Sequence, residues 1–437
     1  MSTERLYDVI VVGAGLSGLS ASQQLLLAGK DVLVLEAGMQ AGGKIESKLV
    51  EDLVLDLGAQ WISPGYEQVL QLCELLGLQV EKKEFPGKNF YATNGIRKYF
   101  TGMIPTHKIS DRLNASRLLS GLEKTRIPDP EKPWLGSDAN KLDKLRFGHY
   151  IKQKTYSSNY SEMIRNIVES RFLNGINQVS ALEAINNWKA GSNGDKWVIV
   201  GGMDQLVRKL TQEVDIHYQQ PVTSVIQEGR LLKIKTLNRN YRCRSAIIAI
   251  PPLQAAGINY IPAVSGGKEK LWNSIEGGRI IKSLLVFESQ AWKKGLWSGQ
   301  GFFNEDYAFN ALFDIGTAGQ ARDILCTYTI GDRCRKLEGL TEAEKKELIL
   351  HQVKSILQMP TDTQVRHFLI RDWKTPPNGP GAYHIFPPGT LTDYAAYIDQ
   401  REGQIYWAAA EYDHLFRGTL EGAVRSGRKA ADAILGI

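Results

Sequence analysis

Residues 8–18, close to the start of the chain, read DVIVVGAGLSG. The β-branched apolar run Val9–Val12 is typical of a strand that is buried on both faces. Apolar residues at helical spacing follow between Leu16 and Ala28, and Gly29 is suited to end that helix. A second apolar run and then an acid come next, so this order predicts a dinucleotide-binding βαβ unit.

The glycines of this unit have separate roles. Gly13 permits a tight turn, Gly15 lets the backbone approach the pyrophosphate, and Gly18 allows close packing of helix and strand. The helix N-terminus presents free N–H groups to phosphates, and Glu36 can accept hydrogen bonds from ribose hydroxyls. The residues of the turn expected to bind the cofactor are Gly13, Ala14, Gly15, Ser17 and Gly18.

A second glycine-rich turn, Ala41–Lys44, follows the acid, and the run VLDLGAQW (Val54–Trp61) follows that turn. A second close approach of the backbone suits a cofactor longer than NAD. The segment resembles the amine oxidase superfamily of flavoproteins, which includes monoamine oxidases, polyamine oxidases and L-amino acid oxidases. The resemblance implies FAD and adds these contacts: Gly42, Gly43, Lys44, Gly58, Ala59, Gln60 and Trp61. Lys44 stands where the family has an arginine, which keeps the charge but loses the bidentate fork.

The resemblance extends over nearly the whole chain in separate blocks. In the segment QPVT, Val222 matches the valine whose backbone meets the adenine. Near the C-terminus, Glu411 matches the cofactor-binding acid, and Leu420 lies at the flavin beside the last helix, whose N-terminus is implied to point at the flavin ring.

Lys282 lies inside the apolar run Ile280–Phe287. A buried ammonium is costly unless water or a partner meets it. Two interpretations are open from the spacing: an edge-strand lysine that reaches solvent, or a functional lysine. The resemblance implies the second, because the family places here a lysine that holds a water against flavin N5.

The C-terminal block Gly381-Ala382-Tyr383 resembles monoamine oxidases, in which a cysteine before the tyrosine bonds covalently to FAD. Because Ala382 replaces that cysteine, FAD is expected to be non-covalent. The resemblance implies that Tyr383 forms an aromatic wall aligning the substrate, with Thr419 opposite and Trp373 lining the cavity. Core packing is the alternative for Trp373 and Tyr383.

The reaction implied is oxidation of an amine at its α-carbon, with hydride transfer to flavin N5 and reoxidation by O2 to give H2O2. Polyamines are the expected substrates, because the stretch Gly58–Gly65 lacks the arginine that L-amino acid oxidases use for the substrate carboxylate. The sequence identifies no acidic partner for a distal ammonium. The alternatives are an L-amino acid oxidase or dehydrogenase, a carotenoid-type desaturase or isomerase, and a flavin-holding protein without catalysis.

Composition excludes some other classes. The formal charge of +6 (53 basic and 47 acidic residues) is small for 437 residues and comes without a dense basic block, so no nucleic-acid partner is expected. The four cysteines are scattered, without metal-ligand spacing, which indicates a reduced, cytoplasmic chain that binds no metal. No apolar stretch is long enough to span a bilayer, and the sequence ends at Gly436–Ile437, so neither the membrane tail of monoamine oxidases nor a membrane partner is expected. The oligomeric state is not indicated.

The fold class expected is α/β, with a discontinuous Rossmann-like FAD-binding domain and an inserted α+β substrate domain. The cofactor blocks fall at 1–79, 197–271 and 376–437, and the substrate domain at 80–196 and 272–375. The first insertion shows helical spacing and the second mixes strands with an amphipathic helix, Glu342–Leu357, for which Thr341 and Glu344 form a predicted capping box. Residues 127–136 are expected to form a loop, and strands are expected at Ile280–Phe287 and Ile324–Ile330.

Overall fold

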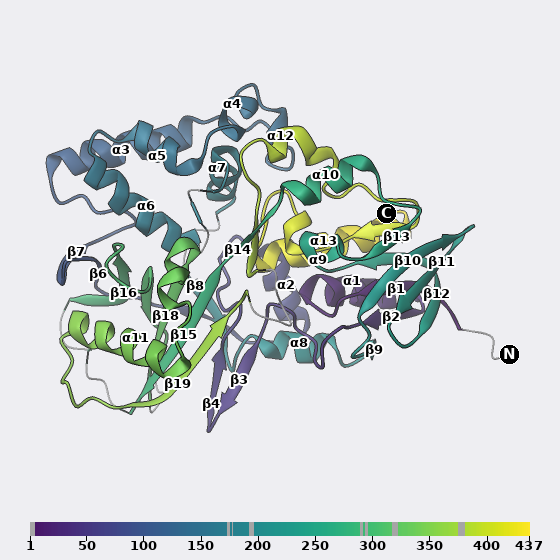
Figure 1. The fold of residues 1–437 in the computed structure, drawn as a ribbon, viewed down its shortest axis with the longest axis horizontal. Helices are drawn as coiled ribbons and strands as arrows, with labels where there is room; N and C mark the ends of the chain where they lie inside the picture. The colour runs from purple at the N-terminus through teal and green to yellow at the C-terminus, as the bar shows by residue number, and fades with distance from the viewer. Residues whose placement is uncertain are drawn as a thin grey trace.

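The structure, a computed structural model, describes residues 5–172, 175–176, 178–191, 196–288, 292, 296–316, 322–374 and 381–437. Figure 1 shows a sheet on the right that contains the N-terminal strand, a second sheet at the lower left, and a group of helices from residues 109–172 above the second sheet. The predicted boundary at residue 376 and the first residues of the predicted FAD domain lie outside the described residues, and the domain limits stay predictions.

The first sheet has eight strands in the described ranges. They are β1 (Leu6–Val12), β2 (Val32–Leu35), β9 (Asp215–His217), β10 (Val222–Glu228), β11 (Leu231–Thr236), β12 (Asn240–Ile248), β13 (Asn259–Ile261) and β21 (Ile405–Trp407). Their order is β13-β10-β11-β12-β1-β2-β9, and β21 pairs with β12. Strand β1 pairs in parallel with β2 and β12, which puts Val9 beside Val32 and Ser245. The predicted parallel βαβ unit is therefore confirmed.

Helices α1 (Leu16–Leu27), α2 (Glu67–Leu75), α8 (Asp204–Leu210) and α13 (Leu420–Leu435) contribute to the apolar core on one face of this sheet. Helices α1 and α13 pack closely against each other. A Cβ added at Gly427 would lie 2.2 Å from the carbonyl oxygen of Ser17, so α13 can lie this close only because the position has no side chain. Figure 1 shows α13 over the first sheet, toward the centre of the molecule.

The second sheet has seven strands within the described chain, in the order β19-β15-β18-β17-β16-β6-β7. They are β6 (Lys88–Thr93), β7 (Ile96–Phe100), β15 (Ile280–Phe287), β16 (Trp297–Phe303), β17 (Ala311–Asp314), β18 (Asp323–Ile330) and β19 (Val365–Asp372). Helix α11 (Glu342–Leu357) packs on one face and has the predicted capping box of Thr341 and Glu344. Strands β15 and β18 and helix α11 were predicted, whereas β6 and β7 interrupt a segment for which helical spacing was expected.

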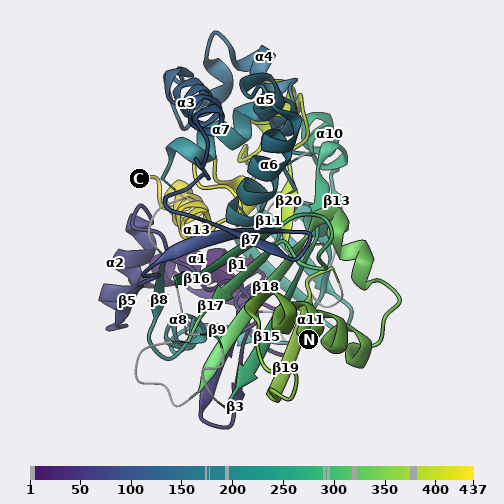
Figure 2. The same cartoon turned by 90° about the vertical axis from the view of Figure 1, so that its left-hand side faces the viewer.

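The remaining helices lie mostly between residues 109 and 189, and Figure 2 shows them above the second sheet. These helices are α3 (Ile109–Lys124), α4 (Ala139–Asp143), α5 (Phe147–Lys154), α6 (Ser158–Phe172) and α7 (Ala181–Lys189). The predicted loop 127–136 contains one short 3-10 turn, Pro133–Leu135. Short helices follow later at α9 (Pro252–Ala255), α10 (Gly266–Ser274) and α12 (Thr390–Tyr394).

Three two-stranded pairs connect these layers. They are β3 (Ser47–Val50) with β4 (Leu53–Asp56), β5 (Val80–Lys83) with β8 (Lys196–Ile199), and β14 (Glu276–Gly278) with β20 (Tyr383–Ile385). The four cysteines are buried and free. Among the described helices, none combines the length and apolar character needed to cross a membrane.

Candidate active site

The turn between β1 and α1 is held by the acid at the end of β2. Gly13 has φ +105°, a conformation that favours glycine. Glu36 accepts hydrogen bonds from the backbone N–H of Ala14 at 2.8 Å and of Gly38 at 2.7 Å. A carboxylate has about four lone-pair positions, so Glu36 retains capacity for the ribose hydroxyls that the sequence assigned to it.

The space above Gly15 is open. A Cβ added there would meet no atom within 4 Å, whereas one added at Gly18 would lie 2.1 Å from the oxygen of Gly13. Gly15 is the N-cap of α1. Because glycine has no side chain, no capping side chain occupies the N–H groups of the first turn. Helix N-termini of this kind bind phosphates, and binding of the cofactor pyrophosphate at this helix end stays a prediction.

The second glycine turn lies directly against the first, as the sequence predicts for one continuous cofactor site. Gly15 and Gly42 form a β-bridge, and the N–H of Gly42 donates to the oxygen of Ala14 at 2.9 Å. The loop after β4 joins them, because the N–H of Ala59 donates to the oxygen of Lys44 at 2.9 Å. A Cβ added at Gly58 would lie 2.2 Å from that same oxygen.

Lys44 also forms an ion pair with Glu411, which brings the second turn to the C-terminal block. The Glu411 side chain is 1% exposed, and its Oε2 is buried without a hydrogen-bond partner among the described residues. Burial alone would raise the pKa of Glu411, but Lys44 and His384 together hold that pKa below its ordinary value. An unpaired, buried carboxylate oxygen beside a cation is consistent with a bound polar cofactor.

Val222 and Leu420 lie at two other edges of this region. The N–H of Gln220, just before β10, donates to the oxygen of Glu36 at 2.8 Å, which brings the Val222 segment to the end of β2. Leu420 is the first residue of α13 and is buried in the core that α1 shares. Their contacts with the cofactor stay predictions.

Lys282 is a buried lysine in a central strand, which excludes the edge-strand alternative. Strand β15 pairs with β18 on one side and β19 on the other, and Lys282 is 1% exposed. Its Nζ donates to Gln60 Oε1 at 2.8 Å and to the Gly58 oxygen at 3.1 Å. Burial lowers the pKa of Lys282, while Cys326 and Asp56 act in the opposite direction. The lysine thus joins the second sheet to the loop that touches the glycine turns.

Trp61 lies in an aromatic cluster on the second sheet. Its indole N–H donates to the Tyr328 hydroxyl at 3.2 Å, and its ring lies 6.2 Å from that of Phe313 and 6.3 Å from that of Phe85. Lys282 Nζ lies 5.5 Å from the Tyr328 ring centroid. The cluster therefore forms an apolar surface next to Lys282, and a contact of Trp61 with the cofactor stays a prediction.

Tyr383 is buried where β20 meets the helices. Its ring covers Gly278, since a Cβ added at that glycine would lie 2.0 Å from a Tyr383 ring carbon. Its hydroxyl accepts the Gly175 N–H at 2.9 Å. Burial, followed by the charge of Glu169, raises the pKa of Tyr383, so the phenol stays protonated.

The other two predicted substrate-site residues have structural partners. Trp373 is 4% exposed and its indole N–H donates to the Leu57 oxygen at 3.1 Å. Thr419 is the N-cap of α13: its hydroxyl oxygen accepts a hydrogen bond from the Gly422 N–H at 3.1 Å, and its O–H donates to the Phe416 oxygen at 2.7 Å. Packing and capping account for these contacts, and the roles of both residues as cavity walls stay predictions.

Sequence reasoning missed two polar residues close to this site, Glu169 and His384. Glu169 follows the helical run at the end of α6, and its Oε2 accepts from Asn310 Nδ2 at 2.9 Å. His384 directly follows Tyr383, and strand alternation alone could have placed it on the opposite face of β20. The sequence therefore contained a signal for the orientation of His384, whereas the position of Glu169 could be found only from the tertiary structure.

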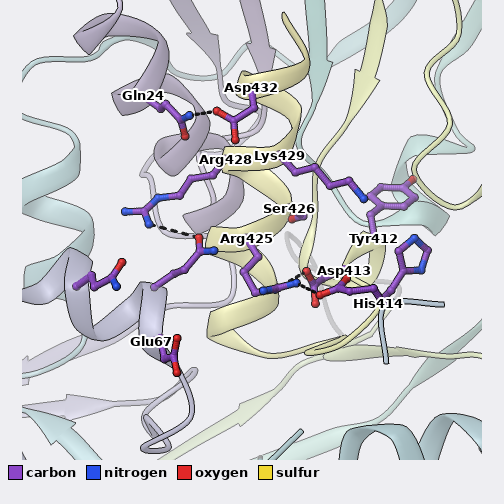
Figure 3. A pocket seen from close by; sticks show the side chains of 13 residues that line it. Gln24, Glu67, Tyr412, Asp413, His414, Arg425, Ser426, Arg428, Lys429 and Asp432 are labelled. Carbon is purple, nitrogen blue, oxygen red and sulfur yellow. Dashed lines mark hydrogen bonds and ion pairs between the residues drawn. The ribbon is translucent and has the colours of Figure 1, made fainter. Parts of the chain in front are cut away.

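A separate pocket of about 420 Å³ lies between α1, α2 and α13 (Figure 3). Its polar groups largely pair with one another: Arg425 forms ion pairs with Asp413 at 2.9 Å and with Glu131, and the Gln24 amide donates a hydrogen bond to Asp432. None of the described residues that line it belongs to the predicted site. We assign it no catalytic role.

Comparison with known proteins identifies relatives over the whole length. The curated protein "Probable flavin-containing monoamine oxidase A" of Dictyostelium discoideum is 27% identical over 99% of this chain and 98% of its own. An "L-amino acid dehydrogenase" of Synechocystis is 26% identical over 98% of this chain and 95% of its own. A solved structure of putrescine oxidase bound to putrescine has a TM-score of 0.89, with 24% identity over 99% of this chain and 100% of that one.

The sequence profile of the flavin containing amine oxidoreductases matches residues 16–435. The residues of the two glycine turns and the Lys44–Glu411 pair fit FAD, the cofactor expected from the sequence. FAD is held non-covalently, since Ala382 has no atom that could bond to a flavin at that position. The chain belongs to the family of flavin-containing amine oxidoreductases.

Proposed function

We propose that the protein is an FAD-dependent oxidase of amines that carry a second positive charge, the polyamines and diamines. FAD supplies hydride acceptance from the α-carbon of the amine and the transfer of electrons to O2. The overall change converts R–CH2–NH2 and O2 into R–CH=NH and H2O2, and the imine then hydrolyses in water.

The observation that carries this proposal is the position of Glu169 relative to Tyr383. The backbone N–H of Gly175 donates to the Tyr383 hydroxyl. A Cβ added at Gly331 would lie 3.9 Å from the Gly175 Cα and 3.8 Å from Glu169 Oε1. Glu169 Oε1 is therefore near Gly175, the residue whose N–H meets the tyrosine that the family resemblance places beside the substrate.

The charge environment of Glu169 suits an ammonium ligand. Among the described residues, none forms an ion pair with it: Arg165 pairs with Glu305 at 2.7 Å, and Arg333 donates to the backbone oxygens of Phe303 and Phe309. Burial, the largest effect, raises the pKa of Glu169 to about 7, while the charges of Arg333 and Arg165 act in the opposite direction. A cation at Oε1 would relieve the cost of this unpaired carboxylate. Glu169 thus provides the acidic partner for a distal ammonium that the sequence did not identify.

The residues around Lys282 support an oxidase. A lysine ammonium has three donors, and the described residues accept two of them through Gln60 and Gly58. The remaining N–H could hold a water at the flavin, which is the role implied by the family resemblance. Tyr383, kept protonated, can align the reacting amine without taking its proton.

An L-amino acid substrate is the second candidate. One relative is named an L-amino acid dehydrogenase, and the guanidinium of Arg371 lies 4.9 Å from the Trp373 ring centroid, where it could meet a carboxylate. Arg371 already pairs with Glu46 at 3.0 Å, however. Arg371 could bind a substrate carboxylate only if its ion pair with Glu46 opened, whereas binding of a polyamine at Glu169 requires no ion pair to open.

An H2O2 assay over a panel of compounds tests the proposal. The panel contains putrescine, spermidine, spermine, a simple aromatic amine and several L-amino acids, each also assayed with an artificial electron acceptor in place of O2. The highest kcat/KM is expected for a diamine or polyamine with O2. A higher kcat/KM for any L-amino acid would overturn the substrate class, and turnover with the artificial acceptor alone would overturn the oxidase.

A further inference from the structure

His384 is a buried side chain whose hydrogen-bonding groups are unused. It is 5% exposed, and neither Nδ1 nor Nε2 has a hydrogen-bond partner among the described residues. Buried polar atoms in folded proteins nearly always have a partner, so an unpartnered ring points to a missing ligand or water. The predicted substrate-site residues do not account for the unpartnered ring nitrogens of His384.

The orientation of His384 follows from its strand. Its neighbours Tyr383 and Ile385 pack in the apolar cluster of α3, α5, α6 and α7. Side chains alternate along a strand, so His384 points away from those helices. Of its charged surroundings, Glu411 raises the pKa of His384 and Lys44 lowers it. The ring therefore faces the region where the second glycine turn meets the C-terminal block.

The same region contains a second unsatisfied atom, Glu411 Oε2, which is also buried without a partner in the described chain. Two buried polar groups without partners, the His384 ring and Glu411 Oε2, thus lie close enough to each other and to Lys44 to interact electrostatically. Burial, the larger effect, lowers the pKa of His384 to about 4. The ring is neutral at physiological pH and offers one donor and one acceptor, a combination that matches hydroxyl and phosphate oxygens.

We propose that His384 is a cofactor-binding residue whose imidazole hydrogen-bonds oxygen atoms of FAD next to the Lys44–Glu411 pair. It complements the glycine turns, which offer backbone N–H groups only. Its position directly after Tyr383 means that one three-residue strand serves both sides of the site: Tyr383 toward the helices and the substrate, His384 toward the cofactor.

Two variants of similar shape test this assignment. His384→Leu removes both polar atoms, and His384→Asn retains one donor and one acceptor. The purified holoenzymes are compared for flavin content, and each flavin-free protein is titrated with FAD while flavin fluorescence is followed. The Leu variant is expected to raise the Kd for FAD about tenfold, and the Asn variant to recover most of that loss. His149→Gln, at an exposed position, serves as the control and should bind FAD as the wild type does.

Wild-type affinity in the Leu variant would overturn the proposal. Equal weakening in Leu and Asn would also contradict it, because packing rather than hydrogen bonding would then be responsible. If neither variant folds, NMR of the wild-type protein labelled with ¹⁵N-histidine gives the answer. Adding FAD should shift the ring nitrogen signals of a buried neutral histidine, and unchanged signals would overturn the proposal.

Discussion

Lys282 Nζ lies 2.8 Å from Gln60 Oε1, although the two residues are 222 positions apart in the chain. The contact joins β15, an interior strand of the second sheet, to the loop that touches the second glycine turn. The Lys282 side chain is almost fully buried, so it is not a surface lysine that contributes to solubility. This burial and the hydrogen bonds to Gln60 and Gly58 support the proposal that Lys282 acts at the flavin.

Replacing Lys282 by methionine tests this role. Lys282→Met keeps the length of the side chain and removes the ammonium, so FAD should remain bound while reduction or reoxidation of the flavin slows by about 100-fold. Stopped-flow absorbance measures both half-reactions separately. Wild-type rates in both would show that Lys282 has a structural role only.

The ionised state of Glu411 should be stabilised by Lys44. In Lys44→Met a buried carboxylate loses its cation, which should cost on the order of 3 kcal/mol of unfolding free energy at neutral pH. Lys44→Arg keeps the charge and should lose much less. Urea unfolding of the flavin-free proteins measures the difference.

The pH dependence of that difference has a definite sign. The folded-state pKa of Glu411 is lowered from 4.5, so the stability that the ion pair provides is present above the unfolded pKa and is lost as pH falls through the folded value. The wild type and Lys44→Met should therefore converge below about pH 4.5. A gap that is constant with pH would contradict this account of the pair.

Glu169 should select substrates with a second ammonium. Glu169→Gln is expected to lower kcat/KM for putrescine about tenfold or more and to leave butylamine nearly unchanged. Glu162→Gln, at an exposed position of the same helix, is the control. Equal losses for both amines would argue against a distal-ammonium site, while the absence of turnover of either amine would contradict the oxidase itself.

The same carboxylate predicts a pH profile. With a pKa of about 7, Glu169 becomes ionised as pH rises through neutrality and only then attracts a cation. The ratio of kcat/KM for putrescine to that for butylamine cancels the deprotonation of the reacting amine, and it should rise through about pH 7 in the wild type. In Glu169→Gln this ratio should be low and flat across that range.

The flavin should leave the denatured protein. Because Ala382 replaces the flavin-linking cysteine, acid precipitation should release yellow FAD into the supernatant. Flavin that stays with the pellet, and appears on one peptide after proteolysis, would identify a covalent attachment elsewhere in the chain.

Local sequence patterns predicted those parts of the fold that depend on short-range chemistry. The glycines that fix the first turn, the buried run of β1 and the Thr341–Glu344 capping box all act within a few residues, so their spacing specifies their structure. Lys282 could be predicted only through the family resemblance, since its burial depends on β19, about 90 residues later.

The remaining features depend on long-range pairing that no local pattern contains. Strands β6 and β7 join a sheet whose other strands begin at residue 280 or later, so their helix-rich surroundings gave no indication of these partner strands. Glu169 lies near Tyr383 only because α6 packs against β20 through residues distant in sequence. Thr419 differs from these: its N-cap contacts involve only the nearby Phe416 and Gly422, and its place opposite Tyr383 stays a prediction from the family resemblance.

Anaerobic mixing of the yellow holoenzyme with single compounds tests the central claim most directly. We expect putrescine or spermidine to bleach the visible flavin absorption rapidly, L-amino acids to leave it unchanged, and O2 to restore it with release of H2O2. Bleaching by an L-amino acid faster than by every diamine and polyamine, or by none of these compounds, would contradict the account.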